Sequence, residues 1–265
     1  MRWLLSARIA IECSPTCAIC CRPSSTFIIL RCSLNATIAA NTSPSTSDRV
    51  DAEKVNPEKT IFYDINTQRD FILHDGKFHI EGAEKIVPVW KAITDFAREE
   101  KIRVVCSVDC HLPGDPQLKS WGGPYPDHCM ANTPGQQKID ETRPLNPLTL
   151  ENREYAPDEI QKVLDHQGEI VFRRQQFEKL AGNPHLSAIL RLVLHPYHDI
   201  VMYGVYTEAC VEREINALIG VGPKLHLITD AVAIVGEESP TFHEKLQQEG
   251  VELLSFDELK IRMLN

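Results

Sequence analysis

Short, continuously apolar segments alternate with amphipathic segments along most of the chain, and this alternation limits the fold more than any other feature. Six segments have the length and β-branched content of buried strands: residues 60–65, 102–108, 169–172, 199–205, 224–229 and 251–255. Helical spacing of apolar residues predicts helices near residues 83–100, 157–166, 185–196, 207–220 and 238–249. Strands that are apolar on both faces need cover on both faces. We therefore predict an α/β, three-layer Rossmann-like fold with a six-stranded parallel sheet flanked by helices.

The first 50 of the 265 residues differ in composition from the rest. They contain two acidic residues, five arginines, no lysine and five of the nine cysteines. An arginine- and serine-rich, acid-poor segment is typical of an organelle transit peptide, and a disordered extension has the same composition. We expect a disordered or targeting extension at 1–50, a folded domain at 58–257 and a C-terminal tail at 258–265.

Charge and cysteine content narrow the class of protein. The net charge is −9 and the only short basic run is Arg173-Arg174, so we expect no nucleic-acid partner. No uncharged apolar run reaches the ~18–20 residues that span a bilayer, so we expect no membrane insertion. The odd cysteine count and scattered positions suit a reducing compartment. We expect a cytoplasmic homo-oligomer, or an organellar one if residues 1–50 are a transit peptide.

Polar and reactive residues follow four of the predicted strands. Ligands of parallel α/β sheets bind beyond the carboxyl ends of the strands. That rule selects residues 64–70, 109–111, 173–174 and 205–210. We therefore expect these four segments to contribute to one site.

Cys210 is the candidate nucleophile. It lies within the first turn of the predicted helix that follows residues 199–205, with Thr207 as a natural N-cap. The positive end of the helix dipole favours a thiolate, the nucleophilic form of cysteine. The alternative is a small buried cysteine that packs the helix against the sheet.

A carboxylate and two histidines are candidate metal ligands. In an extended chain Asp109 and His111 face the same side, and His128 follows in a Gly-Gly-Pro-Tyr-Pro loop. Asp and His suit a divalent metal, Zn²⁺ or Fe²⁺ with Mn²⁺ as a further candidate, and leave positions for water or substrate. We expect Asp115 or water to complete the shell. Histidines that simply pack in a loop are the alternative.

Taken in order, four blocks of residues resemble the isochorismatase-like cysteine hydrolases, and within them the nicotinamidase branch. The blocks are Gln68-x-Asp70-Phe71, Asp109-x-His111, the Gly-Gly-Pro-Tyr-Pro-x-His-Cys run at 122–129, and Gly204-Val205-Tyr206-Thr207-Glu208-Ala209-Cys210-Val211. The resemblance covers residues 58–257. It implies the isochorismatase-like hydrolase fold, a small amide substrate and a role in pyridine nucleotide salvage.

The resemblance also implies a mechanism. A Cys–Asp–Lys triad forms a thioester at Cys210 and releases ammonia. A cis peptide at Val205–Tyr206 would let the backbone N–H groups of Tyr206 and Cys210 form an oxyanion hole. The metal, held by residues matching Asp109, His111 and His128, binds the pyridine nitrogen.

Three departures separate this sequence from the family pattern. The catalytic Asp of the family falls on Asn66, and Asp64 two residues earlier is the alternative base. The family Lys falls on Arg174. A further histidine often found after the D-x-H pair is absent from residues 112–116. The leading hypothesis is a nicotinamidase-like amidohydrolase. The alternative is a catalytically weakened homologue that binds a small ligand or a protein partner.

Overall fold

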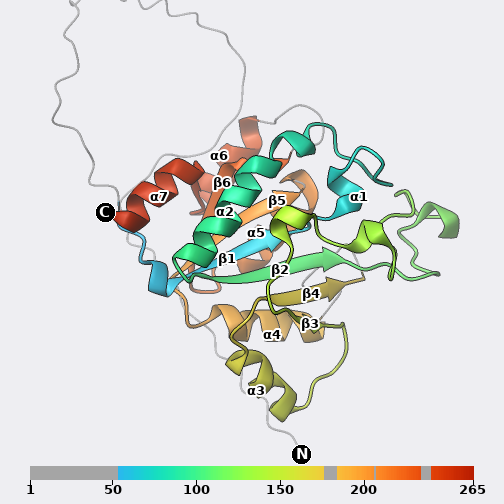
Figure 1. The fold of residues 1–265 in the computed structure, drawn as a ribbon, viewed down its shortest axis with the longest axis horizontal. Coiled ribbons are helices and arrows are strands. Elements are labelled where there is room, and N and C mark those ends of the chain that lie inside the picture. Colours follow the sequence, from blue (N-terminus) through green and yellow to red (C-terminus); the bar gives the residue numbers. More distant parts are fainter. Residues whose placement is uncertain (1–52, 176–183, 206, 234–239) are drawn as a thin grey trace, which may run out of the picture. The chain divides into compact units, whose positions relative to one another are not determined.

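The protein is built around a parallel β-sheet (Figure 1). The structure, a computed structural model, describes residues 53–175, 184–205, 207–233 and 240–265. Within these ranges the sheet has seven strands in the order β3-β4-β2-β1-β5-β6-β7, and all paired neighbours run parallel. The strands are β1 (Thr60–Ile65), β2 (Arg103–Asp109), β3 (Leu148–Leu150), β4 (Ile170–Arg174), β5 (Asp199–Val205), β6 (Lys224–Ala233) and β7 (Glu252–Leu254).

Helices cover both faces of the sheet. The helices are α1 (Arg69–Ile72), α2 (Val87–Glu99), α3 (Pro157–Asp165), α4 (Pro184–Leu194), α5 (Glu212–Leu218), α6 (Pro240–Gln248) and α7 (Phe256–Leu264). Apolar residues of α2 and α7 share one core cluster with Phe62 of β1. Apolar residues of α3, α4, α5 and α6 share the other with Ile61 and Tyr63, which confirms the predicted three-layer α/β fold.

Three details differ from the sequence prediction. The sheet has a seventh strand, β3, a three-residue edge strand inside a Pro- and Asn-rich segment where so short a run carries no pattern. The predicted tail at 258–265 lies largely in α7, whose Leu259 and Met263 are buried. The predicted helix at 207–220 is a π-helical turn, Thr207–Val211, followed by α5. No helix in the described ranges is long and apolar enough to cross a bilayer.

The strand order predicts a ligand site between β1 and β5. The chain builds outward from β1 through β2, then returns to the opposite side of β1 with β5. Such a reversal opens a crevice at the carboxyl ends of the strands. Gly204 of β5 pairs with Ile65 of β1, and a Cβ at Gly204 would lie 1.9 Å from the Ile65 carbonyl oxygen. Only glycine lets the two strands approach this closely, and that approach brings the segment after β5 against the segment after β1.

Candidate active site

Asn66 and Cys210 meet at this crevice. Asn66 follows β1 directly and adopts the left-handed conformation, with φ of 55°, which asparagine tolerates better than most residues. Cys210 lies in the π-helical turn after β5 and is buried. The Asn66 Nδ2 atom lies 3.3 Å from the Cys210 Sγ atom. Two of the four predicted strand-end segments therefore come together as expected.

Partners on both sides fix the orientation of the Asn66 amide. Arg174 of β4 donates a hydrogen bond to Asn66 Oδ1, and Asn66 Nδ2 donates to Asp109 Oδ2 at 3.1 Å. A guanidinium can only donate and a carboxylate can only accept, so the amide cannot be reversed. Asn66 therefore presents an N–H group to the Cys210 sulfur. It can stabilise a sulfur lone pair, but it cannot accept the thiol proton.

Arg174 is a buried cation held by two carboxylates. Its guanidinium lies 2.6 Å from Glu214 Oε1 and 3.4 Å from Asp109 Oδ1. Burial alone would lower the pKa of Arg174, but the Asp109 and Glu214 carboxylates raise it above its ordinary value. The arginine is therefore permanently charged beside Asn66.

Sequence reasoning missed Glu214. This residue lies on α5, four positions after Cys210, and is 1% exposed. The available signal was its spacing, because residues i and i+4 share one face of a helix. In an amphipathic segment rich in charged residues, that spacing does not separate a buried glutamate from a solvated one.

Asp64, the alternative base, belongs to a different cluster. Its carboxylate lies 2.8 Å from Lys138 Nζ and accepts hydrogen bonds from the hydroxyl of Thr67. Thr67 also bonds to Thr142. All four side chains are buried. The structure thus places Asp64 in a self-contained ion pair and places Asn66, not Asp64, against Cys210.

Asp109, His111 and His128 come together as predicted. Their ligand atoms all lie within 4.8 Å of one another, and all three residues are buried. His111 Nδ1 donates to Asp115 Oδ2 at 2.7 Å, and His128 Nδ1 donates to the Pro126 carbonyl at 2.6 Å. Each bond leaves the Nε2 lone pair of its ring available, the arrangement that orients histidine toward a metal. Because Asp115 is bonded to the far nitrogen of His111, it is placed to orient that candidate ligand, which leaves water, the other expected group, to complete the shell.

The protonation state of His128 also suits metal binding. Burial lowers its pKa below the ordinary value, although the nearby Asp109 carboxylate opposes this shift. The neutral imidazole, the form that binds metals, is therefore favoured. Two nitrogens and one carboxylate oxygen fit Zn²⁺ or Fe²⁺.

Backbone contacts hold these ligands in place. The Gln68 side chain forms a pair of hydrogen bonds with the Asp109 backbone, at 2.7 and 2.8 Å. Asp70 accepts a hydrogen bond from the Cys129 N–H at 2.6 Å, which positions the residue next to His128. A Cβ at Gly135 would lie 2.2 Å from the Asp70 carboxyl group, so a side chain there would displace this carboxylate. The Gln-x-Asp-Phe block of the sequence is thus a support for the candidate metal ligands.

A small pocket joins the cysteine to the metal ligands. Among the described residues it is lined by Phe71, Phe78, Asp109, His111, Gln117, Tyr125, His128 and Cys210. Only about 10 Å³ is open to the centre of a water molecule, so a ring-sized ligand needs one wall to move. Larger cavities lie elsewhere, beside Arg98 and His166 for example, and contain none of the residues with this chemistry.

The expected oxyanion residues are only partly described. Val205 ends β5 and is buried. Tyr206 lies outside the described residues, as does the side chain of the expected N-cap Thr207. The oxyanion hole at Val205–Tyr206 therefore stays a prediction.

Comparisons with known proteins agree on the fold. The pyrazinamidase of Pyrococcus horikoshii, solved in complex with zinc, is 21% identical with a TM-score of 0.56, covering 75% of this chain and 99% of its own. PnC1 of L. infantum, solved with nicotinate, is 20% identical with a TM-score of 0.60, covering 77% and 96%. N-carbamoylsarcosine amidase of Thermoplasma acidophilum is 23% identical with a TM-score of 0.56, covering 76% and 98%.

Family membership comes from a sequence profile. No curated protein matches the chain. The isochorismatase domain profile, however, matches residues 61–258, which include all of the described strands except Thr60, together with Asn66, Cys210 and the Asp109–His111–His128 group. The strand order, the site at the carboxyl ends and this match lead to one conclusion: the chain belongs to the isochorismatase family of hydrolases.

Proposed function

We propose that this protein is a nicotinamidase-like amidohydrolase that uses Cys210 to cleave a small aromatic amide to an acid and ammonia. One observation carries the proposal: Cys210 Sγ is hydrogen bonded to Asn66 in the same pocket that Asp109, His111 and His128 line. The aromatic rings of Phe71 and Phe78 form the apolar wall, with His128 at centroid distances of 5.3 and 4.9 Å. Flat walls of this kind suit a planar, ring-bearing amide.

In the proposed reaction the Cys210 sulfur attacks the amide carbonyl carbon. The C–N bond then breaks, ammonia leaves with a proton from water, and water hydrolyses the thioester to release the acid. The Asn66 N–H group donates to the Cys210 sulfur, and Arg174 in turn donates to Asn66, so both groups face the attacking atom with their positive ends. The N–H groups of Cys210 and Tyr206 are the proposed donors to the oxyanion.

Asp109, His111 and His128 are the proposed metal ligands. A bound Zn²⁺ or Fe²⁺ ion would act as a Lewis acid toward a ring nitrogen of the substrate. Neighbouring residues position these three side chains: Asp115 and Pro126 orient the two imidazoles, and Gln68 fixes the Asp109 backbone.

A catalytically weakened homologue is the second candidate. The fixed orientation of Asn66 favours it, because an amide that donates to both Asp109 and Cys210 cannot carry a proton to the leaving ammonia. Losing a general base costs about 10²–10⁴-fold in rate. Such a protein would still bind a small ligand in the same pocket.

Ammonia release distinguishes the two candidates. Purified protein is incubated with nicotinamide or pyrazinamide, with and without added Zn²⁺, beside Cys210→Ala and the matched control Cys110→Ala. Cys110 is another buried cysteine, located after β2, and lines no part of the pocket. The amidohydrolase proposal expects turnover that Cys210→Ala removes and Cys110→Ala retains. Saturable ligand binding without any Cys210-dependent ammonia would instead establish the weakened homologue.

A further inference from the structure

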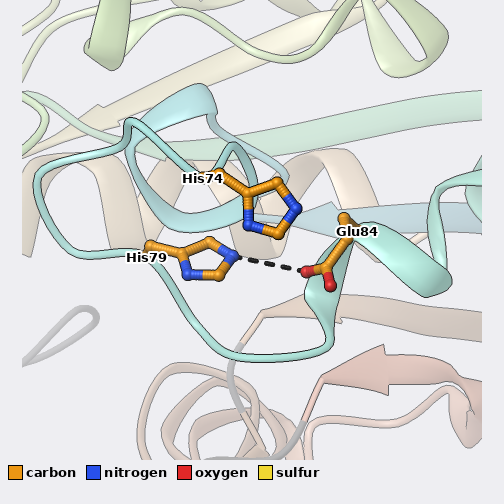
Figure 2. Close-up of side chains that lie close together, drawn as sticks. All are labelled: His74, His79 and Glu84. Carbon is orange, nitrogen blue, oxygen red and sulfur yellow. Dashed lines mark hydrogen bonds and ion pairs between the residues drawn. The ribbon is translucent and has the colours of Figure 1, made fainter.

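A second group of metal-binding side chains lies outside the site described above. His74 and His79 belong to the loop between α1 and the short helical turn Ala83–Lys85, and Glu84 lies in that turn. The three side chains converge in Figure 2. Their ligand atoms all lie within 4.8 Å of one another. None of the three lines the pocket around Cys210.

One of the ligand–ligand distances matches that of a tetrahedral zinc site. Zn–N and Zn–O bonds of about 2.0–2.1 Å place neighbouring ligand atoms about 3.3–3.4 Å apart. His79 Nε2 lies 3.3 Å from Glu84 Oε2. The rings of His74 and His79 lie with their centroids 4.9 Å apart, and a nitrogen of His74 lies within 4.8 Å of the other two ligand atoms. A His79–Glu84 hydrogen bond alone would give the first distance, but it does not require a third ligand atom within 4.8 Å of both.

The loop holds this arrangement through contacts that do not involve the three ligands. Asp70 accepts hydrogen bonds from the backbone N–H groups of Lys77, through its carboxylate at 3.1 Å, and Phe78, through its carbonyl at 3.0 Å. A Cβ at Gly76 would lie 2.4 Å from the Asp70 carbonyl oxygen, so glycine is required for the tight turn between the histidines. Because the backbone is fixed independently, little conformational entropy is lost when an ion binds.

We propose that His74, His79 and Glu84 bind one divalent ion of the zinc class, with water in the fourth position. Two imidazoles and one carboxylate are a known ligand set for zinc with an open coordination position. His74 is exposed, and His79 and Glu84 are half-buried, so an ion can enter from solvent. The site is separate from the proposed amidohydrolase chemistry and does not depend on it.

An ion at this site would affect the wall of the pocket around Cys210. Phe78 lies between Gly76 and His79 and lines the pocket around Cys210. Its ring contacts His128 and Tyr125 at centroid distances of 4.9 and 5.8 Å. An ion bound by His74, His79 and Glu84 ties the loop to the Ala83–Lys85 turn. It thereby limits the movement of the pocket wall that carries Phe78.

Equilibrium dialysis of the full-length protein against micromolar zinc tests the proposal. Zinc is measured for the wild type, His79→Ala, Glu84→Gln and the matched control His195→Ala, an exposed histidine outside both clusters. We expect His79→Ala and Glu84→Gln each to bind one equivalent less than the wild type, and His195→Ala to bind the same amount. Comparing variants cancels any zinc held by the cysteines or by His128. In a His128→Ala background, His79→Ala should still remove one equivalent.

Hydrogen exchange supplies a second readout. Zinc should slow amide exchange in peptides covering residues 73–85 of the wild type and leave the same peptides of His79→Ala unchanged. Wild-type zinc content in both His79→Ala and Glu84→Gln, together with exchange at 73–85 that does not respond to zinc, would overturn the proposal.

Discussion

Replacing Asn66 with aspartate puts a carboxylate where the structure holds a hydrogen-bond donor. The Asn66 Nδ2 atom is 3.1 Å from Asp109 Oδ2, so the new carboxylate would face an existing one. At an effective dielectric constant near 20, two charges at this separation repel by about 5 kcal/mol. Arg174 on the other side offsets much of this repulsion. We therefore expect Asn66→Asp alone to raise the rate of amide hydrolysis only slightly. The increase should be larger when a bound metal ion neutralises the Asp109 carboxylate.

Adding Arg174→Lys to this variant affects Glu214, which pairs with Arg174. Arg174 is the cation 2.6 Å from the buried Glu214 carboxylate. A shorter lysine that turns toward residue 66 leaves this carboxylate uncompensated, at a cost of about 3–5 kcal/mol. Domains of ordinary stability have only about 5–15 kcal/mol in total. The double variant Asn66→Asp/Arg174→Lys should therefore be strongly destabilised in urea unfolding, and adding Glu214→Gln should recover most of the loss.

The triple variant Asn66→Asp/Arg174→Lys/Glu214→Gln gives the sharpest test. It has a base at position 66, a lysine at position 174 and no unpaired carboxylate at position 214, so its rate of ammonia release from nicotinamide should exceed that of the wild type by at least about 10²-fold. Cys210→Ala in the same background should abolish the gain. Asn146→Asp, at another left-handed asparagine, with φ of 46°, controls for the effect of replacing an asparagine in this conformation with aspartate. A folded triple variant that is no faster than the wild type would refute the assignment of Asn66 to the position of the missing base.

Three further predictions test the remaining parts of the site. Asp64→Asn should lower the free energy of unfolding, measured in urea, by about 3–5 kcal/mol, because it leaves the buried Lys138 unpaired. It should not change kcat per folded molecule, and Asp64→Asn/Lys138→Met should recover the lost stability. At pH 8, iodoacetamide should label Cys210, which lines the pocket, before Cys106 and Cys129. Burial raises the pKa of the Cys106 and Cys129 thiols and keeps them protonated. Site-resolved mass spectrometry measures the order of labelling, and equal labelling of the three cysteines would contradict the prediction. Asp115→Asn should weaken zinc binding at the Asp109 cluster by about 10–100-fold, since it loosens the His111 ring; an unchanged affinity in dialysis would show that this hydrogen bond is dispensable.

The fold could be predicted because strands buried on both faces are continuously apolar. That signal is absent from β3, an edge strand of only three residues. The helical periodicity that identifies the other helices is weak in α7, where Leu259 and Met263 supply buried positions in a short, highly charged segment. Alternation of strands and helices gave the layers, and the strand-end rule then located Asn66, Asp109, Arg174 and Cys210 together.

The choice between Asp64 and Asn66 could not be made from periodicity. Residues two apart in a strand face the same side, so both were candidates for the base. The positive φ of Asn66 breaks the extended chain at this point, and its side chain reaches Cys210 while Asp64 reaches Lys138. A left-handed residue after a strand depends on tertiary contacts, and the sequence pattern does not reveal it. Likewise, the spacing around His111 cannot tell a candidate metal ligand from a residue that bonds to one, as Asp115 bonds to His111.

The π-helical turn Thr207–Val211 makes the site sensitive to the number of residues in this segment, which substitutions leave unchanged. A π turn holds one more residue per hydrogen-bonded turn than an α-helix. Deleting one residue there would let the segment close into a continuous α-helix with α5, and each residue of an α-helix is rotated by about 100° from the next. The deletion would therefore act as a rotation, turning the Cys210 sulfur away from Asn66 while α5 and Glu214 stay packed on the sheet. Among related chains, this segment should tolerate changes of side chain more readily than the gain or loss of a single residue.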